Sequence, residues 1–404
     1  MHRNSASLAR SIGCIQASYI TMQCLSTSFF VQAYQRFGID KMTISLIVML
    51  CNATGIIFQP VWGHFVDRSN HPRETVLACC GFSVVCYFVL MYSRGTVWLI
   101  TLMAMLFYAT FHCMMTLIDS WVAKLIRGGL EVNYGQTRSI GCVVYAVVAV
   151  AFGALVTRFG QLIAPYCFGL VFIILCSALV RVPNPKDDSR ETSKVSIREM
   201  IGYLMGNKAY LIVVSALFLS TFTSFTLSTF FSVHVFELGG NELIVGIGTF
   251  FMAISEFPFM FLFTTISKRL KWSSMTALVV AMIFYSAHAF LLGSVRQIGQ
   301  VIAVSVLHGL SYGIYQPAKV MFVVENVESR YIATAQMLMN ALGQSLPAVL
   351  ASPVSGAIST VTSTGAMLRM IAAFSLVGAI VIVVGRRLLR DINIKHVHKQ
   401  DVPR

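Results

Sequence analysis

Long apolar segments alternate with short polar breaks along the chain. Such segments occur twelve times, at approximately residues 10 to 32, 43 to 66, 74 to 94, 97 to 125, 136 to 158, 160 to 181, 209 to 233, 243 to 267, 273 to 293, 298 to 324, 333 to 357 and 366 to 388. A helix of about 20 apolar residues crosses the hydrocarbon core of a bilayer. The segments lack the alternation of membrane-barrel strands, and backbone groups in lipid must be bonded internally, which leaves helices. The pattern therefore predicts an all-α integral membrane protein with twelve transmembrane helices.

The composition agrees with a membrane protein. Of 404 residues, 56% are hydrophobic and only 11% are charged, and the mean hydropathy is +0.75. Because about a quarter of the residues in a soluble domain are charged, this composition excludes the soluble classes. Met1 to Arg10 form a short basic tail without a cleavage-like site of small residues, so we expect the first span to be retained.

A polar segment at the middle of the chain separates two sets of six spans. Residues 182–208 read VPNPKDDSRETSKVSIREMIGYLMGNK, which is typical of a linker. A basic loop follows the second span of each set, with VDR at 66–68 and ISKR at 266–269, as parallel repeats would give. We expect an N-terminal six-helix half at 1–181, a cytoplasmic linker at 182–208, a C-terminal six-helix half at 209–390 and a cytoplasmic tail at 391–404.

Lys and Arg residues are distributed unevenly between the two sides of the membrane. With a cytoplasmic N-terminus, 23 of the 30 fall on the cytoplasmic side and five fall outside. The positive-inside rule therefore predicts that both termini are cytoplasmic, and we expect a location in the plasma membrane. The net charge of +14 then lies against anionic lipid, which indicates membrane lipids and no nucleic acid as partners. The ten cysteines fall in predicted spans without a CxxC pair, so we interpret them as apolar fillers and expect no metal and no cofactor.

Four residues around the break between the second and third spans form a motif. Gly63 would allow close helix approach, and Asp67 can cap a helix or pair with a basic residue. Together with Arg68 and Arg73, they are predicted to form a conformational latch between the two halves on the cytoplasmic side. The alternative is a simple basic loop of the positive-inside kind.

The motif also carries a family resemblance. The stretch GHFVDRSNHPR resembles the signature between helices 2 and 3 of the major facilitator superfamily, G-x-x-x-D-(R/K)-x-G-(R/K)-x-(R/K). It departs from the signature at Asn70, His71 and Pro72. The resemblance implies a secondary transporter whose two six-helix halves rock between outward-open and inward-open states.

Acidic residues inside the spans are rare. Of sixteen acidic residues only Asp119 and Glu256 lie well inside a span, where an ionisable group costs about 3 kcal/mol on insertion scales. Asp119 in LIDSWVAK and Arg138 in NYGQTRSIGCVVYAV both lie toward the cytoplasmic side, and Tyr145 follows Arg138 by two helical turns. A carboxylate, a guanidinium and an aromatic face suit a polyhydroxylated ring. The alternative is a structural salt bridge beside a packed tyrosine.

The sequences of several spans resemble the lactose-permease-like oligosaccharide/proton symporters. FGIDKMTISLIVML and FQPVWGHFVDR resemble their second helix, and YGQTRSIGCVVYA resembles their fifth. The resemblance implies that Arg138 and Tyr145 bind sugar and that Asp119 takes the place of an acidic residue of helix 4.

The tenth span resembles the same symporters but departs from them in its charges. VSVLHGLSYGIYQPAKVMFVVENVESRYIATAQ resembles their helix 10 and the loop after it, which implies that His308 helps to organise the sugar and proton sites. Ser311 stands where the family has its coupling carboxylate, and Ser305 and Gln344 stand where it has lysines. We count His308 and Gln344 among the predicted substrate-binding residues.

Glu256 is the candidate substitute for the missing carboxylate. It lies in AISEFPFMF, and its position also resembles the phenylpropionate-permease-like carriers. We predict that Glu256 and His308 couple transport to protons, with the proton gradient as driving force. The expected function is import of a small polar solute, most of all a sugar or oligosaccharide, by proton symport through a functional monomer. A carrier for an aromatic acid or a nucleoside, a uniporter and a symporter of another ion remain alternatives.

Other motifs have plainer interpretations. GLSYG at 309–313 matches the hydrolase pattern G-x-S-x-G, yet it lies in an apolar helix, so we expect Gly309 and Gly313 to form a close-packing face. The sequence offers no convincing nucleophile and base and no HExxH cluster, so no enzyme is predicted, and a channel would need a repeated pore-lining pattern. We interpret His112 and His288 as satisfied core residues and expect Lys319 to snorkel to the cytoplasmic surface.

Overall fold

The computed structural model describes residues 2–27, 30–69, 72–93, 96–115, 117–118, 121–122, 134–184, 197–327 and 332–400. For some of these, including 63–69, 134–140 and 389–400, it describes the backbone alone. Within the described residues every regular element is a helix. The elements of the first part, which we call the N-terminal half, are α1 (His2–Thr27), α2 (Phe30–Arg36), α3 (Lys41–Ser69), α4 (Pro72–Tyr92), α5 (Val97–Phe107), η1 (Tyr108–His112), α7 (Tyr134–Phe159), η2 (Gln161–Ile163) and α8 (Ala164–Leu179).

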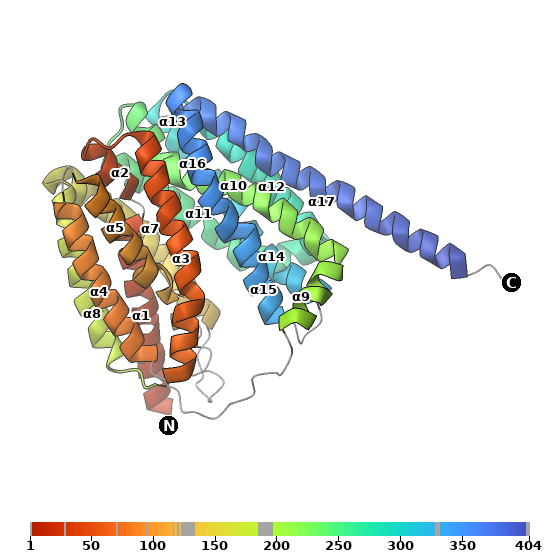
Figure 1. Cartoon of the computed structure of the whole chain (residues 1–404), viewed down its shortest axis with the longest axis horizontal. Coiled ribbons are helices and arrows are strands. Elements are labelled where there is room, and N and C mark those ends of the chain that lie inside the picture. The colour runs from red at the N-terminus through yellow and green to blue at the C-terminus, as the bar shows by residue number, and fades with distance from the viewer. Residues whose placement is uncertain are drawn as a thin grey trace.

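The second part begins with a short helix, α9, and continues with the helices that we call the C-terminal half. Its elements are α9 (Ile197–Gly206), α10 (Lys208–Glu237), α11 (Glu242–Arg269), α12 (Ser274–Leu292), α13 (Ile298–Ser305), α14 (Leu307–Asn326), α15 (Ile332–Asn340), η4 (Ala341–Ser345), α16 (Leu346–Val361) and α17 (Thr364–Gln400). In Figure 1 the N-terminal half, in red to yellow-green, lies beside the C-terminal half, in green to blue.

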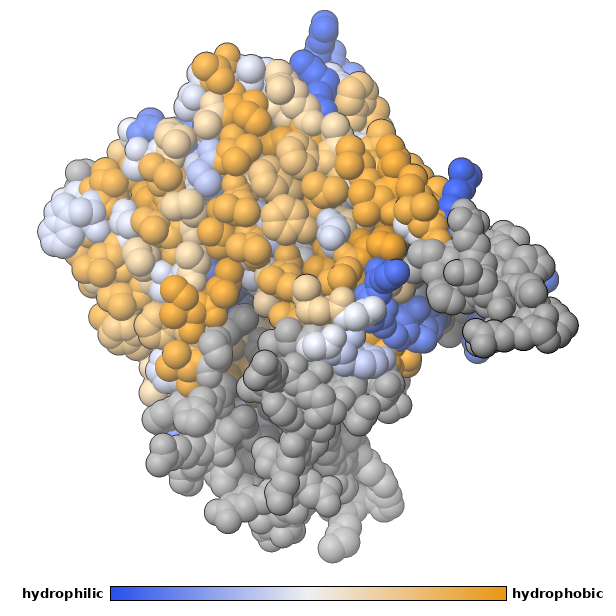
Figure 2. Space-filling view, turned by 45° about the vertical axis from the view of Figure 1, so that its right-hand side comes forward, coloured by the Kyte–Doolittle hydropathy of each residue, from blue (hydrophilic) through white to orange (hydrophobic). Residues whose placement is uncertain are grey.

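Each predicted span overlaps one or more of these helices. Among the described residues, nine helices are long and apolar enough to cross a membrane, and Val97–His112 and Val143–Phe159 are shorter apolar helices. Large apolar side chains such as Ile173 (65% exposed) and Phe261 (74% exposed) face outward. Figure 2 shows that apolar residues cover much of the visible surface, as a lipid-facing surface requires. The predicted all-α membrane architecture is confirmed.

Polar side chains begin several of the helices at the breaks between spans. Each accepts a hydrogen bond from a backbone N–H in the first turn, which would otherwise be unsatisfied. These capping residues are Asp40, Asn207, Asn241 and Ser273. The break between α10 and α11 also contains Gly239, whose φ of 80° is favourable only for glycine. Short sequence signals in the breaks therefore set where the membrane helices begin.

The two halves pack tightly at one end of the molecule, which we call the closed end. There α7 lies against α11 and α3 against α16. A Cβ atom on Gly153 of α7 would lie only 2.7 Å from the backbone oxygen of Glu242, so glycine is needed at this contact. One hydrophobic cluster joins residues of both halves, such as Phe107 and Phe231, whereas a second cluster contains residues of α9 and the C-terminal half alone. The N-terminus lies at the opposite end (Figure 1).

Two helices extend into the predicted linker and tail. Within the predicted linker at 182–208, residues Ile197–Gly206 form helix α9, whose Leu204 is fully buried against the C-terminal half. Helix α17 extends through the predicted end of the last span and continues to Gln400, well into the predicted tail at 391–404. Figure 1 shows its end projecting from the bundle. The residue boundaries of the domains themselves stay a prediction.

Candidate functional site

Two glycines bring α14 unusually close to α11. A Cβ atom on Gly313 would lie 2.9 Å from the Cβ of Phe259 and 3.0 Å from the backbone oxygen of Glu256, and one on Gly309 would overlap Ser255. The close-packing interpretation of both glycines is confirmed. Ser311, between them, donates its hydroxyl to the backbone oxygen of His308 at 3.0 Å, so it serves the helix and not a nucleophilic site.

This close approach brings Glu256 and His308 together. The distance from Oε1 of Glu256 to Nε2 of His308 is 3.3 Å, and the two side chains are 15% and 11% exposed. Both residues were singled out in the sequence, and the structure shows that they meet. A carboxylate and an imidazole at this distance can share or exchange a proton. Both residues lie within membrane-length helices, where a charged side chain carries a free-energy cost.

Aromatic rings surround the pair. The ring of His308 stacks on Tyr312, with centroids 5.6 Å apart and an angle of 11° between the planes. Tyr285 of α12 approaches His308 edge-on at 6.2 Å and Tyr315 edge-on at 5.6 Å. Tyr285 and Tyr315 are 1% and 3% exposed, so their rings pack inside the protein, whereas Tyr312 is half-buried and suits stacking on a sugar ring or a planar base.

His288 of α12 lies beside the pair. Its ring centroid is 5.5 Å from that of His308, and its side chain is fully buried. Neither ring nitrogen has a hydrogen-bond partner among the described residues. The expectation of a satisfied core histidine is therefore wrong, because the residue is buried but unsatisfied. The ring of His112 stacks on Tyr108, with centroids 5.2 Å apart, and the expectation that its nitrogens are satisfied stays a prediction.

Gln344 belongs to a second polar cluster of the C-terminal half. Nζ of Lys319 donates to Oδ1 of Asn340 and to Oε1 of Gln344, both at 2.9 Å. Lys319 is 5% exposed, so the expectation that it snorkels is wrong: the two amide oxygens solvate its ammonium group inside the protein. The π-helical turn η4 carries Gln344, and such turns occur often at functional sites. The role of Gln344 in substrate binding stays a prediction, and its oxygen is engaged by Lys319.

The predicted site of the N-terminal half is described only in part. Asp119 lies outside the described residues, and Arg138 lies on α7 with its side chain outside them. Tyr145 is half-buried on the same helix, two turns further on. Gly141, between them, packs against Ile20 of α1. Whether the three side chains meet stays a prediction.

The predicted latch is also described only in part. Gly63, Asp67 and Arg68 lie on the last turns of α3, with their side chains outside the described residues. The guanidinium of Arg73 pairs with Glu74 at 2.7 Å, and its backbone N–H donates to Asn184 at 3.2 Å. Glu74 belongs to the N-terminal half and Asn184 to the segment after α8, so these contacts of Arg73 do not reach the C-terminal half, and a latch between halves stays a prediction.

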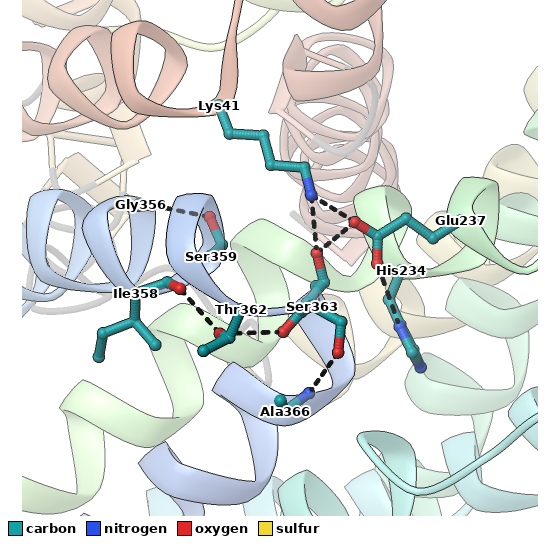
Figure 3. Close-up of polar contacts among 10 residues, drawn as sticks. Lys41, His234, Glu237, Gly356, Ile358, Ser359, Thr362, Ser363 and Ala366 are labelled. Carbon is teal, nitrogen blue, oxygen red and sulfur yellow. Dashed lines mark hydrogen bonds and ion pairs between the residues drawn. The ribbon is translucent and has the colours of Figure 1, made fainter.

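A contact between halves that the sequence reasoning missed lies at the closed end. Lys41 of α3 donates to Glu237 of α10, as Figure 3 shows. Thr364 donates to the same carboxylate at 2.7 Å and accepts from Lys41 at 3.4 Å. We call Lys41, Glu237 and Thr364 the closed-end cluster. Opposite charges in the breaks after the first and seventh spans were the signal that could have found it.

A second ion pair joins the two halves at the closed end. Arg36 pairs with Glu242 across the halves, and Nδ1 of His234 lies 4.0 Å from Oε2 of Glu237. The carboxylate of Glu242 is 2% exposed. Charged pairs of opposite halves therefore hold the closed end in addition to helix packing.

Comparisons with known proteins agree with this architecture. Residues 26–370 match the MFS_1-like family. The chain is 25% identical over 305 residues to the uncharacterized transporter YwbF of Bacillus subtilis (strain 168), which covers 74% of this chain and 73% of the relative. It is 24% identical over 330 residues to the maltose permease of Geobacillus stearothermophilus, which covers 80% of each.

Solved structures of transporters share the fold. The crystal structure of the nucleoside transporter NupG superposes with a TM-score of 0.78 at 12% identity, covering 94% of this chain and 98% of that one. A bacterial homologue of the human lysosomal transporter Spinster, in an inward-facing and unoccupied conformation, gives a TM-score of 0.67 at 12% identity, with 95% of each chain covered. The family match spans most of the chain, so the protein belongs to the MFS_1-like family and is a membrane transporter of the major facilitator type, not an enzyme.

Proposed function

We propose that the protein is a proton-coupled carrier that imports a small polar solute, most of all a sugar or oligosaccharide. The observation that carries the proposal is the 3.3 Å contact between Glu256 and His308 within membrane-length helices. A transporter that uses a proton gradient needs a group that binds and releases a proton inside the membrane. This pair is such a group.

Proton binding would govern which states the carrier can visit. With substrate in the site, an ionised Glu256 resists the change of state, whereas a proton shared with His308 neutralises the carboxylate. In the proposed cycle, the loaded carrier changes state with the proton bound, and the empty carrier returns with both proton and substrate released. The loss of a fixed carboxylate at Ser311 is compatible with this cycle because Glu256 supplies one from the adjacent helix.

The closed-end cluster supports alternating access. The proposed orientation has both termini in the cytoplasm, and the closed end then faces outward and the opposite end faces inward. Uptake requires the closed end to open, and Lys41 must then separate from Glu237. We propose that Gly63, Asp67, Arg68 and Arg73 act at the inner end when the outer end is open.

The substrate class follows from the relatives and from the aromatic rings. The maltose permease among the relatives favours a sugar. We propose that Asp119 and Arg138 bind its hydroxyl groups, that Tyr145 stacks on its ring and that His308 and Gln344 contact it from the other half. A nucleoside is the second candidate, because the half-buried Tyr312 lies beside His308 and offers an aromatic face to a base. We further propose a monomer in the plasma membrane without a cofactor.

A proton-uptake assay tests the proposal. De-energised cells that produce the protein are suspended in weak buffer, and maltose, lactose or uridine is added while the external pH is recorded. We expect a transient rise in pH with one sugar. The rise should disappear in Glu256→Gln, while exchange of labelled sugar for unlabelled sugar persists.

A matched carboxylate provides the control. Glu325 lies at the end of α14 and accepts a hydrogen bond from Ser274 at 2.5 Å, away from the Glu256 pair, so Glu325→Gln should keep the pH response. A rise with uridine alone would move the assignment to nucleosides. Saturable sugar exchange without any pH change would contradict proton symport and indicate a uniporter or another coupling ion.

A further inference from the structure

His288 is a buried ionisable residue to which the proposed cycle gives no task. It lies on α12 with an exposed fraction of 0%, and neither Nδ1 nor Nε2 has a partner among the described residues. Nearly all buried polar groups in proteins have a hydrogen-bond partner. A histidine that leaves both nitrogens unsatisfied inside a membrane helix therefore needs an explanation beyond packing.

The neighbouring His308 provides an explanation for the unsatisfied nitrogens of His288. The ring of His308 faces Glu256 with Nε2, and its other nitrogen, Nδ1, is also buried without a partner among the described residues. The rings of His288 and His308 are 5.5 Å apart at their centroids and inclined by 68°. Three ionisable groups thus follow one another across three helices, from Glu256 on α11 through His308 on α14 to His288 on α12.

Among the described residues, the additional titratable neighbours of the two histidines are tyrosines: Tyr285 of α12 and Tyr312 and Tyr315 of α14. Two charged or titratable side chains approach the closed end of α12. Arg369 of α17 donates to the backbone oxygen of Gly293 at 2.8 Å, and His234 of α10 is bonded to that of Leu292 at 2.9 Å.

We propose that His288 is a further proton-carrying residue of the coupling site. This inference rests on the proposed function. The proton of Glu256 passes to Nε2 of His308, the N–H bond at Nδ1 of His308 breaks, and an N–H bond forms on a nitrogen of His288. Because the centroids are 5.5 Å apart, one ring turns about its χ2 bond to complete the transfer.

The transfer separates the proton from the carboxylate without releasing it from the protein. The positive charge then lies on His288, and Glu256 is ionised and able to accept hydrogen bonds from a hydroxyl of the substrate. In the reverse step the carboxylate is neutral again. The site can therefore hold one proton in two arrangements, which differ in what Glu256 offers to the substrate.

Nitrogen NMR of the histidine rings tests this inference without a substrate. The full-length protein is labelled with ¹⁵N-histidine and studied in lipid nanodiscs between about pH 5 and pH 8, the range in which histidines change charge. Signals are assigned by their loss in His288→Asn and His308→Asn. We expect the signals of His288 and His308 to change together over one pH range, and that range to move in Glu256→Gln, in which His288 itself is intact.

A histidine outside the proposed site provides the control for the NMR experiment. His112→Asn, which removes a membrane histidine stacked on Tyr108 in the other half, should leave both signals unchanged. If His288 keeps one neutral form over the whole range, and its signals do not respond to Glu256→Gln, the inference is refuted.

Transport assays on two variants distinguish a failure of this inference from a failure of the proposed function. With maltose as the probe, we expect His288→Asn to retain exchange of labelled for unlabelled sugar and to lose most of the pH rise. A pH rise that persists in Glu256→Gln would refute the proposed function itself. A defect in Glu256→Gln together with an inert His288 would refute only the inference.

Discussion

Lys41, at the start of α3, donates a hydrogen bond to the carboxylate of Glu237, at the end of α10, and so joins the two halves of the transporter at their closed end. Thr364 at the start of α17 bonds to both. The three helices converge at this point, as Figure 3 shows for Lys41 and Glu237. A carrier that alternates its access must break this contact in each cycle.

Removal of the Lys41 side chain should favour opening of the closed end. Lys41 and Glu237 are 30% and 32% exposed, so the pair contributes at most about 1 kcal/mol. Lys41→Ala should therefore shift the equilibrium toward the open state by a factor of up to about 5. The distance between spin labels at the end of α7 and the start of α11, both at the closed end, measures this shift. Arg386→Ala, which removes a contact to Thr276 within one half, should leave the distance distribution unchanged, and an equal shift there would contradict the assignment.

A larger residue at Gly153 should prevent complete closure. Its Cβ would lie 2.7 Å from the backbone oxygen of Glu242, so α7 and α11 must move apart. Overpacking of this kind costs about 1–3 kcal/mol, and Gly153→Val should destabilise the closed arrangement by that amount. The same spin labels report the change. Gly299→Val is the control, because no atom of another described segment lies within 4 Å of the added Cβ.

Replacement of Lys319 should destabilise the C-terminal half. Lys319→Met removes the donor to the oxygens of the exposed Asn340 and the half-buried Gln344, and the loss of the two hydrogen bonds costs about 1–3 kcal/mol. Thermal unfolding in detergent, followed by tryptophan fluorescence, should show a lower midpoint. Lys268→Met replaces an exposed lysine of α11 and should leave the midpoint unchanged. Equal stability of the two variants would favour a lysine that reaches the surface.

Asp40 should contribute a pH-dependent part of the stability. The hydroxyl of Thr43 donates to its carboxylate at 2.5 Å and the backbone N–H of Thr43 donates at 3.0 Å, and these bonds lower the pKa of Asp40 below its ordinary value of 3.8. Because the pKa is lower in the folded state, the stabilisation is present above pH 3.8 and is lost as the pH falls through the folded pKa. Asp40→Ala should therefore lower the unfolding midpoint at neutral pH, and the difference from the original protein should shrink in acid. A difference that stays constant with pH would rule out the carboxylate as its cause.

Some of the site could be inferred from the sequence because single positions carried the signal. Glu256 stood out as an acid within an apolar span, and Gly309 and Gly313 stood out by their helical spacing. Both signals are local. The expectation that Lys319 reaches the surface is wrong for the same reason. It rests on the position of Lys319 along its own helix, whereas its partners, Asn340 and Gln344, come from another part of the chain.

Which segments can cross the membrane follows from the amino-acid sequence, because length and apolar composition are properties of each segment alone and the bilayer acts on each directly. Which polar residues meet depends on the packing of the helices. The contacts of His308 with Glu256 and His288 join three helices, and the contact of Lys41 with Glu237 joins two halves. Such contacts depend on how far helices approach and rotate against each other, and that is set by side chains packing along their whole lengths.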